Sequence, residues 1–163
     1  MIPEIKNILY ATDLSESARH CFGYAASLSE RYGATITILH VLEDLTPSTV
    51  IRVREIMGEK QWLELLERNK QQIIDKIHKR IEELCQDASN GKTACNFQVG
   101  DILIPEGPAV ATILETADKS GADIIVMGTH GYGTFKEALM GSTARRVVRR
   151  SPVPVLTVRL PQE

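Results

Sequence analysis

The sequence predicts a doubly wound α/β fold, in which helices cover both faces of one parallel sheet. Two observations carry this prediction. Short apolar runs alternate with segments of helical periodicity along the whole chain, and no linker or low-complexity stretch interrupts them. The length of 163 residues fits one domain, residues 1–163, and the composition of 43% hydrophobic and 25% charged residues is typical of globular proteins.

The first βαβ unit is expected at the start of the chain. Residues 7–11 form a continuous apolar run, as in strands that parallel sheets bury on both faces. A helix follows, because apolar residues recur at intervals of three and four: Ala18, Cys21, Ala25, Leu28 and Tyr32. Asp13 or Ser15 can cap its start, and Gly33 stands where glycine ends many helices. Residues 34–41 are rich in β-branched side chains and predict the second strand.

The middle of the chain has a longer helical pattern. Residues 42–58 are of mixed character, and we expect a partly helical loop there. A long amphipathic helix is predicted from 59 to about 86. Its apolar face comprises Leu63, Leu66, Ile73, Ile77, Ile81 and Leu84. A third strand is expected at 93–99, followed by an irregular stretch at 101–105.

The last third of the chain continues the alternation. A helix is predicted over 108–121, since proline suits its first turn, and a fourth strand at 123–127. A glycine-rich loop over 128–141 leads into a short helix at 142–150. The fifth strand is expected at 155–159.

Charge and cysteine content exclude several function classes. The net charge of -2 disfavours general nucleic-acid binding. No apolar run reaches the ~18–20 residues of a membrane span, and we recognise no signal peptide. Cys21, Cys85 and Cys95 are odd in number and widely spaced, so we expect neither a disulfide framework nor a zinc site. These features predict a reduced, cytoplasmic protein.

The loop after the fourth strand is the strongest candidate site. Gly128 and Gly131 allow positive φ and close approach of a ligand to the main chain. Gly141 opens a helix whose first N–H groups have no intrahelical partner, and Ser142 and Thr143 add hydroxyl donors. Each residue alone would be read as a turn or a cap. Their combination after a predicted strand favours a phosphate site.

Other residues near this loop have two interpretations each. Asp13 could accept hydrogen bonds from ribose hydroxyls or could cap the first helix. Val41 could present its main chain to an adenine edge or could be a core residue. His130 could donate to a phosphate or could be an exposed loop residue. Arg145 and Arg146 are expected to raise the potential near the phosphates.

The spacing of Gly128, Gly131, Gly141 and Ser142 resembles the G-x2-G-x9-G-(S/T) signature of ATP-binding universal stress proteins. Three segments resemble that family in the same order along the chain: 8–15, 122–128 and 151–158. The resemblance is weakest over residues 42–91, a variable helical insertion. Ala11 stands where many members have proline.

The resemblance implies a five-stranded sheet in the order 3-2-1-4-5, of the Rossmann-like, adenine-nucleotide α-hydrolase type. It also implies ATP, or ADP or AMP, as ligand, with Mg²⁺ at the phosphates. It further implies a homodimer through the last strand, 155–159. The resulting candidate nucleotide site comprises Ala11, Thr12, Asp13, Val41, Met127, Gly128, His130, Gly131, Gly141, Ser142 and Thr143.

These expectations describe a stress-response regulatory protein that binds ATP as a ligand or switch and hydrolyses it slowly at most. No nucleophile with an adjacent base is visible in the sequence. One alternative is an enzyme of the same fold, although its usual H-I-G-H or S-G-G-x-D-S signature does not occur. A second is a receiver-like signalling domain without nucleotide, for which Asp13 and Asp101 form a poor acidic cluster.

Overall fold

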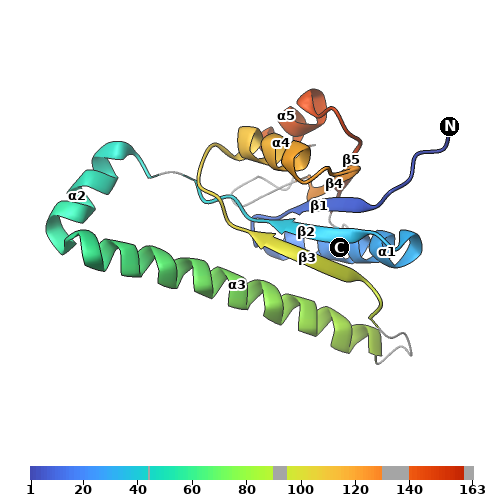
Figure 1. Ribbon diagram of the computed structural model, residues 1–163, viewed down its shortest axis with the longest axis horizontal. Helices are drawn as coiled ribbons and strands as arrows, with labels where there is room; N and C mark the ends of the chain where they lie inside the picture. The colour runs from blue at the N-terminus through green and yellow to red at the C-terminus, as the bar shows by residue number, and fades with distance from the viewer. Residues whose placement is uncertain (44, 90–94, 130–139, 160–163) are drawn as a thin grey trace.

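The computed structural model describes residues 1–43, 45–89, 95–129 and 140–159 (Figure 1). Its elements in chain order are β1 (Asn7–Ala11), α1 (Glu16–Tyr32), β2 (Thr35–Leu39), α2 (Pro47–Met57), α3 (Glu59–Ser89), β3 (Gln98–Leu103), α4 (Ala109–Lys119), β4 (Ile124–Gly128), α5 (Ser142–Arg150) and β5 (Val155–Val158). The strands pair in parallel in the order β3-β2-β1-β4-β5. The predicted fold class and strand order are confirmed.

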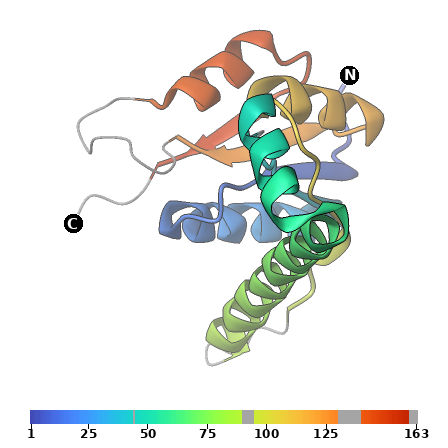
Figure 2. The ribbon, with the colours of Figure 1, turned by 90° about the vertical axis from the view of Figure 1, so that its left-hand side faces the viewer.

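Helices lie on both faces of the sheet, and an apolar core separates the helices from the sheet on each face (Figure 2). On one face α1 and α3 pack against β1 and β2, and Phe22 and Ile77 are buried there. On the other face α4 and α5 pack against β1 and β4, and Ile113 and Val147 are buried. Because both faces of the central strands are covered, these strands read as continuous apolar runs in the sequence.

The first helix begins and ends as its sequence predicts. The Oγ of Ser15 accepts a hydrogen bond from the N–H of Ala18 at 3.2 Å, so Ser15 is the N-cap and Asp13 is not. Gly33 ends the helix with a φ of 66°, and its N–H donates to the Ser29 carbonyl. The carboxylate of Asp13 therefore does not cap α1.

The insertion after β2 forms two helices that extend past the sheet (Figure 1). The expected loop at 42–58 contains the helix α2, which has no buried residue. The C-terminal half of α3 packs Ile73, Ile77 and Ile81 against the core. Leu63, predicted on the same apolar face, is 55% exposed, so that prediction is wrong for the half of α3 that lies beyond the sheet. Among the described helices, none combines the length and apolar character required to cross a membrane.

The third strand lies later in the chain than predicted. It spans Gln98–Leu103, and Asp101, expected in an irregular stretch, is part of it. β3 is the edge of the sheet beside β2, where one side of the strand is unpaired. Asp101 is exposed there, so its charged side chain costs little free energy of folding. The strand therefore lacks the continuous apolar run by which β1 was recognised in the sequence.

Two of the three cysteines form a disulfide, so the expectation of a reduced protein without a disulfide is wrong. Cys85 near the end of α3 is joined to Cys95 ahead of β3, with Cα atoms 5.5 Å apart and a sequence separation of 10. Cys21 is free and buried. Spacing alone gave no sign of the pair, because the two cysteines meet only where the chain returns from α3 toward β3.

Candidate functional site

The carboxyl ends of β1, β2 and β4 border a cavity of about 830 Å³. Ala11, the last residue of β1, pairs with Leu39 of β2 on one side and with Met127 of β4 on the other. All three residues line the cavity. The chain leaves β1 toward β2 and returns on the far side as β4, so the cavity opens at the switch point where α/β sheets bind ligands.

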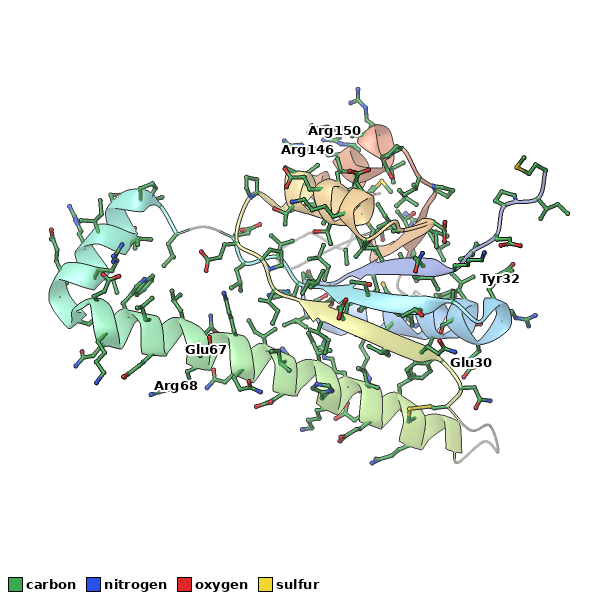
Figure 3. The ribbon with its side chains drawn as sticks, in the orientation of Figure 1. Glu30, Tyr32, Glu67, Arg68, Arg146 and Arg150 are labelled. Atoms are coloured by element: carbon green, nitrogen blue, oxygen red, sulfur yellow. A yellow bond between two sulfur atoms is a disulfide. The ribbon has the colours of Figure 1, made fainter. Side chains whose placement is uncertain are left out.

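The structure brings most of the predicted site residues together. Those that line the cavity are Ala11, Thr12, Asp13, Val41, Met127, Gly128, Gly141, Ser142 and Thr143. His130 and Gly131 lie outside the described residues. Arg145 and Arg146 are exposed and do not line the cavity, and Arg146 projects with Arg150 from the outer side of α5 (Figure 3).

The first turn of α5 faces the cavity without a cap. Gly141 is the N-cap residue and has no side chain that could bond the helix amides. The first intrahelical bond of this turn runs from the Arg145 N–H to the Gly141 carbonyl at 3.0 Å. The N–H groups of Ser142 and Thr143 therefore have no partner among the described residues. With the helix dipole, they form a site for an anion at the cavity wall.

Gly128 and Gly141 do not have the positive φ that favours glycine. Gly141 has φ -65° and ψ 157°, which any residue can adopt. Gly128 ends β4 and is not among the residues with positive φ, which corrects the expectation for that position. The N–H of Gly141 donates to the Thr129 carbonyl at 2.6 Å, and the Thr129 N–H donates to the Val158 carbonyl at 3.0 Å. These bonds fix the start of α5 to the ends of β4 and β5.

The loop after β1 is held by its own polar side chains. The Thr12 N–H continues the ladder to the Leu39 carbonyl at 2.9 Å. The Oγ1 of Thr12 accepts the Leu14 N–H at 3.0 Å, and the Oδ1 of Asp13 accepts the Ser15 N–H at 3.0 Å. These turn contacts orient the half-buried carboxylate of Asp13 at the cavity wall.

A residue of the inserted helix completes this loop. Leu14 is buried and has a φ of 63°, which is uncommon for a side chain of its size. The guanidinium of Arg80, on α3, donates to the Leu14 carbonyl at 2.6 Å and to the Ser15 carbonyl at 3.2 Å. The insertion therefore supports the loop that carries Asp13.

The chain after β2 presents a main-chain edge to the cavity. The N–H of His40 donates to the Leu103 carbonyl at 3.0 Å, and the N–H of Leu42 donates to the Pro105 carbonyl at 2.8 Å. Val41 lies between them, so its N–H and C=O point away from β3. These two groups have no hydrogen-bond partner among the described residues. A planar ligand with adjacent donor and acceptor atoms could pair with this edge.

Several lining residues were not predicted. The Nδ1 of His40 lies 2.9 Å from the Thr12 carbonyl, so it donates and ties the end of β2 to the β1 loop. Thr129, buried beside Gly128, and Glu43 also line the cavity. His40, Thr129 and Glu43 all adjoin predicted site residues, so the extension of each predicted loop by one or two residues would have included them. Lys76 of α3 also lines the cavity, and no local pattern in the sequence marks it.

Two ionisable groups are buried beneath the β1 loop. Burial raises the pKa of the Tyr10 hydroxyl above its usual range, and this hydroxyl donates to the Ala18 carbonyl. Burial, with a smaller contribution from the negative charge of Asp13, raises the pKa of the Cys21 thiol to about 11. Both groups are therefore neutral at physiological pH and serve the packing of α1 rather than chemistry in the cavity.

Comparison with known proteins places the chain among relatives of similar length. The protein is 28% identical over 158 residues to universal stress protein MJ0577 of Methanocaldococcus jannaschii, covering 94% of each chain. The solved structure of MJ0577 superimposes with a TM-score of 0.75, covering 99% of this chain and 100% of that one. Universal stress protein UspA from Lactobacillus plantarum is 25% identical, with a TM-score of 0.74 and coverage of 97% and 100%.

Two more distant structures with the same fold contain ligands. One is a universal stress protein in complex with cAMP, 20% identical with a TM-score of 0.60, covering 96% of this chain and 98% of that one. The other is the universal stress protein from Archaeoglobus fulgidus in complex with dAMP, 18% identical with a TM-score of 0.53, covering 93% and 96%. The Universal stress protein family model itself matches residues 4–159. The chain therefore belongs to the universal stress protein family.

Proposed function

We propose that this protein is a stress-response regulatory protein that binds ATP, or another adenine nucleotide, in the cavity at the end of β1 and β4. The observation that carries the proposal is the uncapped first turn of α5, which opens into the same cavity as the Asp13 carboxylate and the Val41 main chain. An anion site, a hydroxyl acceptor and a base-pairing edge within one cavity match the three parts of a nucleotide.

The roles follow from this arrangement. The amides and hydroxyls of Ser142 and Thr143 hold the phosphates, and the missing side chain of Gly141 lets them approach. Gly131 and His130 belong to the phosphate loop in this proposal. The Asp13 carboxylate accepts hydrogen bonds from the ribose, as acidic residues after a strand do in dinucleotide folds.

The base occupies the part of the cavity nearest β2. The main chain of Val41 pairs with the adenine edge, and the small side chain of Ala11 leaves space for the ring. Met127 and Gly128 lie beneath base and ribose, beside Thr12. The complexes of two fold relatives with cAMP and dAMP support the choice of an adenine nucleotide.

Magnesium enters with the phosphates in this proposal. Within the described part of the chain, no three His, Cys, Asp or Glu side chains gather into a group that could hold a metal. The Ser142 and Thr143 hydroxyls line the cavity and are suitable oxygen donors. Mg²⁺ usually keeps several waters and binds through substrate phosphates, so protein donors of this kind fit it. The metal would neutralise phosphate charge at the start of α5.

We assign the nucleotide the role of a ligand or switch with slow hydrolysis at most. His40, the imidazole in the described lining, donates its Nδ1 proton to the Thr12 main-chain carbonyl and not to a hydroxyl nucleophile. A phosphate-release assay tests this assignment. Turnover well above about one per second would be enzymatic, since enzymes typically run at about 10 per second.

Unfolding with and without ligand tests the binding itself. ATP with Mg²⁺ at about 100 times the dissociation constant should raise the free energy of unfolding by about 2.7 kcal/mol. Calorimetric titration with ATP, ADP, AMP and GTP would then rank the ligands. The absence of any shift at millimolar concentrations of all four would overturn the proposal.

We also propose a cytoplasmic homodimer that forms through the outer edge of β5. The Pro154 carbonyl accepts a hydrogen bond from Ile125 of β4, and the Val158 carbonyl accepts one from Thr129, the residue after β4. Val155 and Thr157 therefore direct their main-chain groups outward from this edge strand. Thr157→Pro removes one outward N–H and leaves the bonds to β4 intact. Sedimentation should give a dimer for the wild type and a monomer for the variant. A dimer that persists would place the interface elsewhere.

A further inference from the structure

We propose that the inserted helix α3 contributes to ligand selection through Lys76, which makes the cavity discriminate in favour of anionic ligands. This inference rests on the proposed function and deepens it. Lys76 lines the cavity together with Asp13 and Leu14, although it lies more than sixty residues from either in the sequence. It comes from the segment in which the family resemblance is weakest.

The position of Lys76 is fixed by the residues around it on α3. Ile73 and Ile77 pack against the core on either side of it, and Ile77 is 4% exposed. Arg80, one turn further along, donates its hydrogen bonds to the Leu14 and Ser15 carbonyls. Residues four apart lie on the same side of a helix, so Lys76 is directed to the same edge of the sheet as Arg80. Lys76 therefore lies at the cavity rim, where it lines the cavity.

The charges of the cavity give this position its importance. The described lining contains the carboxylates of Asp13 and Glu43 and one cation, that of Lys76. Lys76 forms no ion pair with another described residue. Without it, two negative charges would face an anionic ligand. With it, the lining offers a positive charge to the ligand beside the amides of α5.

The arginines of α5 do not take this role. Arg145, Arg146, Arg149 and Arg150 are exposed and lie outside the lining, and Figure 3 shows Arg146 and Arg150 on the outer side of the helix. Selection by charge at the described rim therefore depends on α3. As α3 continues into the projecting part of the insertion, a ligand held by Lys76 would touch both the sheet and the insertion (Figure 1).

Affinities for a charged and an uncharged ligand test the inference. Titrations with Mg²⁺-ATP and with adenosine are compared for the wild type, Lys76→Gln and Lys79→Gln at low salt. Lys79 is an exposed cation of the same helix that does not line the cavity, so its variant matches the change in net charge. We expect Lys76→Gln to weaken ATP binding about fivefold and to leave adenosine binding within about twofold. Lys79→Gln should leave both affinities within about twofold.

The possible results separate this inference from the proposed function. Equal losses for ATP and adenosine in Lys76→Gln, or equal effects of the two variants, would overturn the role of Lys76 while nucleotide binding stands. A wild type that binds neither ligand would overturn both together. Because Lys76 is exposed, its variant should melt like the wild type, and circular dichroism confirms that the comparison concerns folded protein.

Discussion

Arg80 of α3 donates a hydrogen bond of 2.6 Å to the main-chain carbonyl of Leu14, a buried residue with a φ of 63°. The left-handed conformation is unfavourable for leucine, so the surrounding contacts must stabilise it. Thr12 and Arg80 supply two of them, one at the N–H and one at the carbonyl of Leu14. The conformation of the loop that carries Asp13 thus depends on the insertion.

Arg80→Met should lower the free energy of unfolding by about 1–3 kcal/mol, because the Leu14 carbonyl would lose a charged donor at a partly buried position. Urea denaturation measures the change. Lys79→Met is the matched control, since Lys79 is exposed on the same helix, and it should change stability by less than about 0.5 kcal/mol. Equal effects of the two variants would show that the Arg80 bonds contribute nothing specific.

Replacement by alanine should change stability in opposite directions at Gly23, inside α1, and at Gly33, the C-cap of α1. Gly33 has a φ of 66°, so Gly33→Ala should destabilise by about 1 kcal/mol even though a Cβ there meets no atom within 4 Å. Gly23 lies inside the helix, and its Cβ would also meet nothing within 4 Å. Gly23→Ala should therefore stabilise by about 0.5–1 kcal/mol. The melting temperatures of both variants test this prediction. A change of the same sign in both variants would contradict the backbone conformations described for the two glycines.

The sequence predicted the central elements well for a physical reason. β1 and β4 are covered on both faces, so nearly every residue must be apolar, and caps such as Ser15 and Gly33 act locally. β3 was misplaced because an edge strand tolerates Asp101. Leu63 was misjudged because helical periodicity does not reveal where a helix leaves the body of the protein.

The candidate site also contains residues that the sequence could identify and residues that it could not. Residues that a loop joins directly to a strand end, such as Asp13 and Ser142, could be found from position and residue type. Lys76 and Arg80 could not, because their part in the site depends on how α3 is rotated about its own axis against α1. That rotation is decided by the packing of Ile73 and Ile77, which a single sequence does not relate to the β1 loop.

Reduction of the disulfide should destabilise the protein. The Cys85–Cys95 bond closes a short loop between α3 and β3, and loss of such a cross-link should cost about 2–3 kcal/mol. Denaturation with and without dithiothreitol measures this cost, with Cys85→Ser/Cys95→Ser as the control that should not respond to the reductant. Thiol titration of the unfolded, unreduced chain should find one thiol, Cys21, and three would show that the bond does not form in solution.

Stability should fall in the alkaline range because of Cys21. Its pKa is raised to about 11 in the folded protein from an ordinary value of 9.0. Between these values the unfolded chain loses the thiol proton while the folded chain keeps it, so the free energy of unfolding decreases as the pH rises from about 9 to about 11. The stability difference between wild type and Cys21→Ala isolates this contribution, since Tyr10 titrates in both proteins. A difference that stays constant over this range would contradict the burial of the thiol.

Gly141→Asp should separate stability from binding. The backbone at Gly141 suits any residue, and an aspartate there could accept the open amides of the first turn of α5 and place a negative charge at the positive end of the helix. We expect the free energy of unfolding to rise by about 0.5–1 kcal/mol. The new carboxylate would accept the Thr143 or Ala144 N–H and would repel the phosphates, so ATP should no longer stabilise the variant.

Gly141→Ala is the control for this substitution, because it adds a Cβ but no acceptor. If the amides of Ser142 and Thr143 hold the phosphates, the alanine variant keeps a reduced but measurable ATP-dependent shift in melting temperature, because its Cβ narrows the approach, while the aspartate variant loses the shift. Loss in both variants would mean that the close approach at Gly141 matters more than the free amides. Retention in both would place the phosphates away from α5, because a carboxylate that caps the first turn from position 141 would compete with a phosphate for those amides and repel it.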